Sequence, residues 1–334
     1  MSATYRYLHL DVFTDHVFGG NQLAVFPEPA GLDAGTLQAI TREMAYSECT
    51  FVFPPEDPRT AVRVRIFTPG KELPMAGHPT IGTAFALAHE GVIAPGQEEI
   101  VFGLGVGPIR VRLRWEDCPR SEDRGSHRNG MAGLQAQRGT AGLQASGKQC
   151  LEFAEMQQLL PTFGEPLADI AAVAAALNLE ARDIAATRSP VQSVSCGMPF
   201  LLVPLATRAA VDRALVDRAA LARLCRALGI AEEVLIFSTE PGEDEATAYS
   251  RMFAPGLGVT EDPATGAASG PLGCYLVRHG LVSRDKAQKI VSVQGVKMGR
   301  PSRIHIAIGV EGDKITDVRV GGTAVVVGEG TLRW

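Results

Sequence analysis

A short motif that occurs twice is the feature that most restricts how this chain can fold. The sequence RIFTPG at residues 65–70 returns as RMFAPG at residues 251–256. Each copy leads into a glycine-containing loop and then a segment of helical character, which ends at Gly91 in the first copy and at Gly280 in the second. Because both parts match at a nearly constant spacing, we predict two similar domains, each with strands wrapped around one central helix.

The periodicity of apolar residues indicates the kind of sheet. Apolar and polar residues alternate in four segments: residues 7–12, 62–66, 109–114 and 304–308. Such alternation is typical of strands with one buried face and favours antiparallel sheets. Helical patterns cover three further segments: residues 33–44, where Asp33 can cap the first turn, 166–177 and 212–228. The sequence therefore predicts an α+β fold with mostly antiparallel sheets, and not a Rossmann fold.

Residues 116–149 differ in composition from the rest of the chain. They contain no Val, Ile, Phe, Tyr or Trp, and the sequence AGLQA occurs twice, at residues 132–136 and 141–145. Such a segment cannot bury enough apolar surface to offset the entropy of ordering. We therefore predict a flexible insertion or linker between the two domains.

Charge and cysteine content restrict the partners. The chain has 32 basic and 37 acidic residues and a net charge of −5, which argues against a nucleic-acid or anionic-membrane surface. It contains no apolar run long enough to span a bilayer and no pattern of a secretion signal. The six cysteines lie far apart without metal-ligand spacing, so we expect reduced thiols, no disulfide framework and no metal, in a cytoplasmic protein. No nucleotide or flavin motif is present, so we expect no cofactor.

Two glycines stand at corresponding places in the repeats. Gly77 and Gly266 each precede a segment of helical character. Free N–H groups at a helix N-terminus attract anions. If the repeats face each other, both N-termini point into one cleft, where they suit the carboxylate of a small substrate. The alternative is that these glycines only form turns.

Three side chains are candidates for acid–base chemistry. Glu48 lies where a helical pattern ends and an apolar strand begins, so partial burial could raise its pKa toward that of a general base. Alternatively, Glu48 is a solvated surface group. His78 and Asp262 could orient a substrate between the two repeats. Alternatively, Asp262 caps the following helix and His78 bonds to the backbone.

Taken together, these segments resemble the PhzF family, the phenazine-biosynthesis isomerases within the diaminopimelate-epimerase fold. The matching segments follow the order of the family and span nearly the whole chain except residues 116–149: residues 10–15, 20–25, 47–52, 65–69, 77–80, 261–266, 294–295, 300–302 and 320–322. The resemblance implies a pseudo-twofold, diaminopimelate epimerase-like fold in which each domain is a β-barrel-like sheet around a central helix. The N-terminal domain would comprise residues 1–115 plus about 310–334, and the C-terminal domain residues 150–309. Homodimerisation is also implied.

The resemblance assigns roles to individual residues. Glu48 matches the single acid/base of the family, and His78 and Asp262 match its assisting polar groups. The residues expected to bind the substrate are Ser47, Gly77, Gly266, Ala267 and Asn21. Two departures from the family pattern are Ala267, where a Ser is usual, and Gln22, where a Pro is usual.

We therefore expect a cofactor-independent isomerase that moves a proton within a small carboxylate-bearing substrate. The type reaction of the family is isomerisation of trans-2,3-dihydro-3-hydroxyanthranilate. The thiol pair of diaminopimelate epimerases is replaced by Ala76 and Thr265, which argues against a two-thiol mechanism. Two alternatives stay open: a member that binds small carboxylates or a protein partner without catalysis, and an amino-acid epimerase with a different second base.

Overall fold

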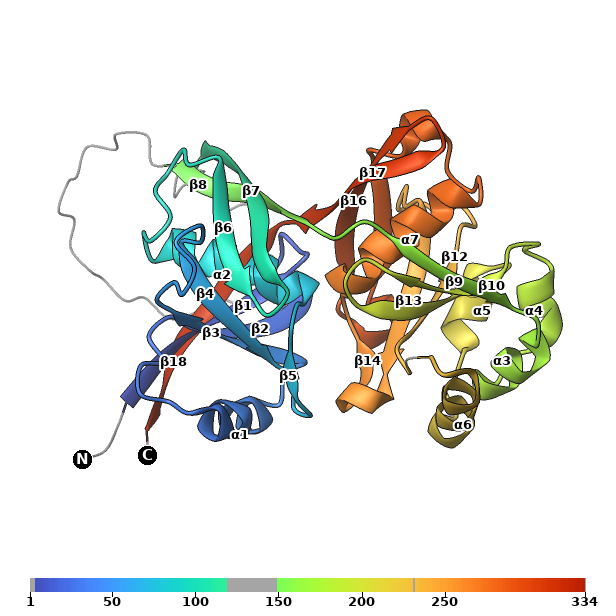
Figure 1. Ribbon diagram of the computed structural model, residues 1–334, viewed down its shortest axis with the longest axis horizontal. Coiled ribbons are helices and arrows are strands. Elements are labelled where there is room, and N and C mark those ends of the chain that lie inside the picture. Colours follow the sequence, from blue (N-terminus) through green and yellow to red (C-terminus); the bar gives the residue numbers. More distant parts are fainter. Residues whose placement is uncertain (1–3, 119–148, 231, 334) are drawn as a thin grey trace, which may run out of the picture.

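The computed structural model describes residues 4–118, 149–230 and 232–333 (Figure 1). Its strands in the first part of the chain are β1 (Thr4–Val12), β2 (Asn21–Phe26), β3 (Glu48–Phe53), β4 (Val62–Phe67), β5 (Glu72–Leu73), β6 (Glu99–Leu104), β7 (Gly107–Asp117) and β8 (Gln149–Gln157). The later strands are β9 (Thr162–Leu167), β10 (Val191–Ser195), β11 (Pro199–Pro204), β12 (Val234–Ser238), β13 (Ala248–Ala254), β14 (Val259–Asp262), β15 (Ile290–Gln294), β16 (Ser302–Glu311), β17 (Lys314–Gly322) and β18 (Ala324–Arg333). Together they form one large, curled sheet in a mixed α/β protein.

The helices are distributed unevenly along the chain. The α-helices are α1 (Ala34–Met44), α2 (Gly77–His89), α3 (Ile170–Ala176), α4 (Ala181–Ala185), α5 (Arg208–Arg213), α6 (Arg218–Leu228) and α7 (Gly266–Arg278). The described residues also include the short 3₁₀ turns η2 (Pro255–Leu257), η3 (Arg284–Lys286) and η4 (Val296–Met298). Figure 1 shows α3 to α6 gathered at one end of the molecule and α2 and α7 surrounded by strands.

The order of strand pairs repeats along the chain. The pairs β1–β2 antiparallel, β2–β3 parallel, β3–β4 antiparallel and β4–β6 parallel recur as β10–β11, β11–β12, β12–β13 and β13–β15 in the same orientations. The strand β18 returns to pair with β1, as β9 pairs with β10. We call β1–β8 with β18 the N-terminal half and β9–β17 the C-terminal half. The repeated sequence motif thus lies on equivalent strands, β4 and β13.

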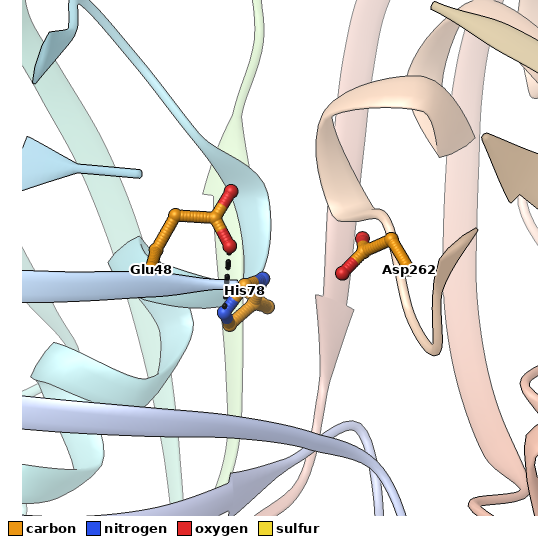
Figure 2. Close-up of side chains that lie close together, drawn as sticks. All are labelled: Glu48, His78 and Asp262. Atoms are coloured by element: carbon orange, nitrogen blue, oxygen red, sulfur yellow. Dashed lines mark ion pairs between the residues drawn. The ribbon is translucent and has the colours of Figure 1, made fainter. Parts of the chain in front are cut away.

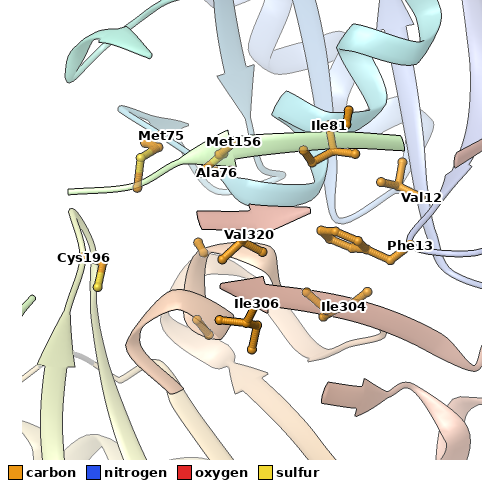
Figure 3. Packing of buried hydrophobic residues seen from close by; sticks show 14 of the residues in the cluster. Val12, Phe13, Met75, Ala76, Ile81, Met156, Cys196, Ile304, Ile306 and Val320 are labelled. Carbon is orange, nitrogen blue, oxygen red and sulfur yellow. The ribbon is translucent and has the colours of Figure 1, made fainter. Parts of the chain in front are cut away.

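The two central helices are buried along most of their length. Helix α2 is buried from Gly77 to Leu87 and helix α7 from Gly266 to Leu276. Both begin at the glycines that the sequence pattern placed there. One apolar cluster joins the halves: Val12 and Ile81 of the N-terminal half lie in the same cluster as Ile306 of the C-terminal half (Figure 3). Packing across this cluster fixes the helix N-termini relative to each other.

Helix boundaries follow the capping residues. Asp33 caps α1 by accepting a hydrogen bond from the Thr36 amide, as predicted. The predicted helix over residues 166–177 is shorter, because β9 extends to Leu167 and Asp169 caps α3. The predicted helix over residues 212–228 is interrupted between α5 and α6, where Asp217 caps the second helix. In both places a side-chain oxygen that satisfies free N–H groups decides where the helix starts.

A disulfide joins Cys118 to Cys150, with Cα atoms 5.0 Å apart. The expectation that all thiols are reduced is therefore wrong for this pair. The antiparallel register of β7 with β8 opposes Glu116 to Cys150, which brings the two cysteines together at the end of this strand pair. The other four cysteines form no disulfide and are buried.

The predicted insertion lies mostly outside the described residues. Its two ends, residues 116–117 and 149, belong to β7 and β8. None of the described helices combines the length and apolar character that a membrane span needs.

Candidate active site

Three polar side chains from separate segments converge between the halves. Glu48 is the first residue of β3, His78 lies in the first turn of α2, and Asp262 ends β14. One nitrogen or oxygen atom from each side chain lies within 4.8 Å of those from the other two. Figure 2 shows Glu48 in contact with His78, and Asp262 facing both from the other half. These are the three residues that the sequence predicted to be catalytic.

The N-termini of α2 and α7 meet at this place. A Cβ atom on Gly77 would lie 2.5 Å from the backbone nitrogen of Ala267, and one on Gly266 would lie 3.0 Å from the Cα atom of Gly77. The first contact is shorter than real Cβ atoms show and the second is very tight, so the close approach of the two helices requires glycine at position 77 and favours it at position 266. The partial positive charges of both helix N-termini thus act on the same small volume.

A small cavity of about 30 Å³ lies at this junction. Its polar wall consists of Glu48, His78, Asp262 and Thr265, beside the backbone of Ala76, Gly77, Gly266 and Ala267. Its apolar wall consists of Leu73, Met198, Phe200, Met252 and Leu257. The volume is of the order needed for a water molecule, so a larger ligand enters only if the walls move apart.

Asp262 is held by donors from both halves. Its Oδ1 accepts a hydrogen bond from Asn21 Nδ2 at 2.7 Å, and its Oδ2 accepts one from Thr265 Oγ1 at 2.5 Å. The Ser47 side chain also bonds to it. Gln294 supports the same loop by donating to the Asp262 carbonyl and accepting from the Thr265 amide.

Burial sets the protonation states. Burial raises the pKa of Glu48 well above its ordinary value, and the nearby charge of Asp262 acts in the same direction. Burial also raises the pKa of Asp262 to about 6, although its hydrogen bonds oppose this. Burial lowers the pKa of His78 to about 3. At neutral pH, Asp262 is therefore largely ionised. It faces the neutral imidazole of His78 and the carboxyl group of Glu48, which binds its proton more tightly than Asp262 does.

Two reactive atoms have no partner. Glu48 Oε2 and His78 Nε2 are buried and form no hydrogen bond with any described residue, and they lie 3.5 Å apart. Because His78 is neutral, this contact is not an ion pair. Buried polar atoms without partners are rare in folded proteins and are typical of positions that act on a ligand.

The same donor set could in principle hold a metal ion. However, metal ligation requires ionised carboxylates, and burial favours the protonated form of Glu48. Both oxygens of Asp262 already accept hydrogen bonds. The chemistry of the site therefore favours proton transfer over metal binding.

The residues predicted to bind substrate fall into two groups. Gly77, Gly266 and Ala267 line the cavity. Ser47 and Asn21 lie outside this lining and bond to Asp262 instead. Sequence reasoning did not identify Thr265 and Gln294 as partners of this loop. Their only signal was their position within segments that match the family.

A larger, open groove of about 680 Å³ lies elsewhere, beside β9, the end of α7 and the β16–β17 hairpin. Its one acidic lining residue, Asp313, has a side chain that is 96% exposed and pairs with Arg284. The groove therefore lacks a buried carboxyl group, and the cavity at Glu48 is the better candidate for catalysis.

The curled sheet around two central helices and the buried acid–base cluster define an isomerase of the PhzF class. Residues 10–330 match the family model described as phenazine biosynthesis-like protein (PhzC-PhzF), and the chain belongs to this family. The resemblance found in the sequence is thus confirmed.

Relatives cover the whole chain. It is 34% identical to an uncharacterized isomerase (mll1393) of Mesorhizobium japonicum, over 98% of this chain and 99% of the relative. It is 31% identical to the trans-2,3-dihydro-3-hydroxyanthranilate isomerase of Pseudomonas aeruginosa, over 98% of both chains. A solved structure of a predicted epimerase (PA4716) from Pseudomonas aeruginosa superposes with a TM-score of 0.74 at 31% identity, over 98% of this chain and 99% of that chain.

Proposed function

We propose that this protein is a cofactor-independent isomerase in which Glu48 moves a proton within a small carboxylate-bearing substrate. The observation that supports this most directly is the free Oε2 atom of Glu48. It is buried, has no hydrogen-bond partner among the described residues, and belongs to the wall of the cavity between the halves.

The reaction needs one group that acts first as base and then as acid. Ionised Glu48 removes a proton from a carbon conjugated with the substrate carboxylate, and the electron pair of the C–H bond enters the conjugated system. Protonated Glu48 then returns the proton to another carbon of that system. The composition of the substrate is unchanged, and Glu48 regains its starting state.

The raised pKa of Glu48 serves both steps. A carboxylate that binds its proton tightly is a stronger base toward carbon, although a smaller fraction is ionised at neutral pH. The backbone N–H groups at Gly77 and Gly266 would hold the substrate carboxylate, whose negative charge increases during proton removal. His78 and Asp262 would contact polar substituents of the substrate.

The apolar wall favours a substrate with a ring or alkyl body. Three relatives are named trans-2,3-dihydro-3-hydroxyanthranilate isomerase, which supports this compound as the first to test. Ala267, where the family usually has a Ser, removes one hydroxyl group from the cavity wall. We therefore propose a related compound with one polar group fewer as a second candidate.

Proton NMR in D₂O tests the proposal. Wild-type protein is incubated with trans-2,3-dihydro-3-hydroxyanthranilate and with a panel of small amino and hydroxy acids. We expect an isomerised or deuterated product, and a loss of about 10²–10⁴-fold in the Glu48→Gln variant. The exposed Glu43 provides the matched control, Glu43→Gln, which should react like wild type. Near-normal turnover by Glu48→Gln would disprove the mechanism, and a ligand that binds without exchange would favour a binding protein.

Epimerisation is a second candidate, because two carboxyl groups with raised pKa values, Glu48 and Asp262, line the same cavity from opposite halves. Such a pair could act on the two faces of one carbon atom. Chiral analysis of the product distinguishes the reactions: inversion at a single carbon supports epimerisation, whereas a shifted double bond supports isomerisation.

Assembly is a separate proposal. We propose a homodimer, on the basis of the family resemblance. Analytical ultracentrifugation tests it, and a monomer at micromolar concentration would contradict it.

A further inference from the structure

The side chain of Gln294 is buried behind the loop that carries Asp262 and Thr265. Gln294 is the last residue of β15 and is 1% exposed. Its Nε2 atom lies 2.6 Å from the Asp262 carbonyl oxygen and 3.0 Å from Thr265 Oγ1, and its Oε1 atom lies 3.1 Å from the Thr265 amide nitrogen. One carboxamide group thus forms three hydrogen bonds to two residues of the site.

Two backbone groups fix the orientation of this carboxamide. A backbone N–H group can only donate and a backbone carbonyl can only accept. The oxygen of Gln294 must therefore face the Thr265 amide, and its NH₂ group must face the Asp262 carbonyl. The second hydrogen of the NH₂ group then points to Thr265 Oγ1, so this hydroxyl oxygen accepts a hydrogen bond from Gln294.

The hydroxyl group of Thr265 is oriented in turn. Its oxygen accepts from Gln294, and its single hydrogen is donated to Asp262 Oδ2, 2.5 Å away. A bond of this kind favours the ionised form of the carboxylate. Thr265 and Asp262 line the cavity, whereas Gln294 does not. Gln294 therefore acts on the cavity through these two residues.

Thr265 also precedes the first turn of α7, where a threonine hydroxyl often caps the helix. Thr207 does so in α5, because its Oγ1 accepts from the Ala210 amide at 3.1 Å. The hydroxyl of Thr265 makes no such bond to α7. The backbone angle ψ of Thr265 is 86°, between the 73° of Asp169 and the 99° of Asp217, which both cap their helices. This angle therefore permits a cap that the hydroxyl does not form.

The missing cap concerns donors at the cavity. N–H groups in the first turn of a helix have no partner within the helix. In α7 this turn starts at Gly266 and Ala267, which line the cavity together with Glu48, whose Oε2 atom has no hydrogen-bond partner among the described residues. A hydroxyl cap would occupy donors that the proposed function assigns to the substrate carboxylate.

We propose that Gln294 is a positioning residue that turns the Thr265 hydroxyl toward Asp262 and away from α7, so that the first-turn N–H groups of α7 stay free for a carboxylate ligand. The ligand part of this proposal rests on the proposed function. The orientation of the hydroxyl does not, and it can be observed in the protein without any ligand.

The first test is a pair of crystal structures without ligand, of wild type and of Gln294→Met. Methionine has nearly the length of glutamine but no N–H group. We expect the Thr265 hydroxyl to bond to Asp262 in wild type, and to lie within hydrogen-bond distance of the Ala267 or Ala268 amide in the variant. A hydroxyl that stays on Asp262 in the variant would overturn the proposal.

The second test is the binding of benzoate, a ring with one carboxylate, measured by titration calorimetry at pH 8.5. This pH lies well above the pKa of Asp262, which is about 6, so that residue is ionised. We expect Gln294→Met to weaken benzoate binding about fivefold, the effect of losing one hydrogen bond. Unchanged binding would contradict the proposal.

A second substitution distinguishes orientation of the hydroxyl from general support of the loop. Thr265→Val keeps the shape of the side chain but has no hydroxyl group that could cap α7. In the Thr265→Val protein, the further change Gln294→Met should weaken benzoate binding by less than about twofold. An equal loss with and without the hydroxyl would show a merely structural role of Gln294 and overturn the proposal.

Gln192→Met is the matched control. Gln192 is also buried, and its amide bonds to the Gly164 carbonyl and to the His279 ring, away from the cavity at Glu48. This variant should bind benzoate like wild type.

Two further outcomes are covered. If Gln294→Met does not fold, Gln294→Asn replaces it, because the side chain is one methylene shorter and its amide is withdrawn from Thr265. The same rotation of the hydroxyl is then expected. If wild-type protein does not bind benzoate, the assignment of the α7 N–H groups to a carboxylate fails together with that part of the proposed function. The crystal structures still decide the orientation of the hydroxyl.

Discussion

At the scale of single residues, burial decides the chemistry of this protein. Glu48 and Asp262 have the same functional group, but only Asp262 accepts hydrogen bonds on both oxygens, from Asn21 and Thr265. Asp262 is therefore easier to ionise than Glu48, although both are buried. When two neighbouring carboxyl groups differ in proton affinity, one can stay ionised and supply negative charge while the other exchanges a proton.

We predict that Glu48→Gln stabilises the folded protein at pH 7–8. Because the folded state binds the Glu48 proton more tightly than the unfolded state, the free energy of unfolding falls as pH rises above about 4.5, the ordinary pKa of Glu. The Gln side chain does not titrate, so the variant lacks this pH-dependent fall in stability. Its Tm should exceed that of wild type by about 2 °C or more at neutral pH and be similar to that of wild type at pH 4. Calorimetry at pH 4, 6 and 8 measures this, and equal differences at all three values would refute it.

We predict that Ala267→Ser raises kcat/KM for trans-2,3-dihydro-3-hydroxyanthranilate by about fivefold. Ala267 lines the cavity, and one additional hydrogen bond to the substrate is worth about 1 kcal/mol. Steady-state kinetics of wild type and variant provide the comparison. A decrease would mean that the native substrate places an apolar group against Ala267.

At the scale of elements, the site depends on how closely the N-termini of two helices approach each other. The N-termini of α2 and α7 meet through Gly77 and Gly266, and each helix is flanked by equivalent strands. Each half therefore supplies one helix N-terminus to the same cavity.

We predict that Gly77→Ala lowers the free energy of unfolding by about 2 kcal/mol or more and abolishes turnover. The added methyl group would press against the backbone of Gly266 and Ala267 and force the helices apart. Gly328→Ala is the matched control, because a Cβ atom there would have no neighbour within 4 Å. Chemical unfolding and the exchange assay measure both effects, and similar stability of the two variants would contradict the prediction.

At the scale of the whole molecule, polar contacts and a shared core hold the halves together. Asp11 of β1 is almost fully buried and pairs with Arg300 of the C-terminal half at 2.5 Å. Arg300 also donates to the carbonyls of Gly19 and Gly20. These bonds fix the segment that leads directly into Asn21, so the attachment of the halves and the geometry of the site are linked.

We predict that Arg300→Ala lowers the free energy of unfolding by about 3 kcal/mol or more, because it leaves the buried Asp11 carboxylate without its guanidinium partner. Arg182→Ala, which removes an exposed pair with Glu180, should change it by less than about 1 kcal/mol. Urea unfolding measures both variants. Equal stability of the two would show that the Asp11 pair contributes no more than a surface contact.

The elements that could be predicted from the sequence are those set by neighbouring residues. Alternation identified β1, β4, β7 and β16, Asp33 located the start of α1, and the repeat placed the starts of α2 and α7. The predicted boundaries at residues 166–177 and 212–228 were wrong because Asp169 and Asp217 cap later turns. The choice between competing caps depends on the strands and helices packed nearby.

The sequence by itself determined the repeat, the family and the three polar residues Glu48, His78 and Asp262, because each is a matter of residue type and order. Only the tertiary structure decided how these residues are protonated and which partners hold them. Asn21 and Asp262 are 241 positions apart in the chain, yet their side chains form a 2.7 Å hydrogen bond. Burial, and with it each pKa, arises from contacts between distant segments, so it is a property of the folded chain alone.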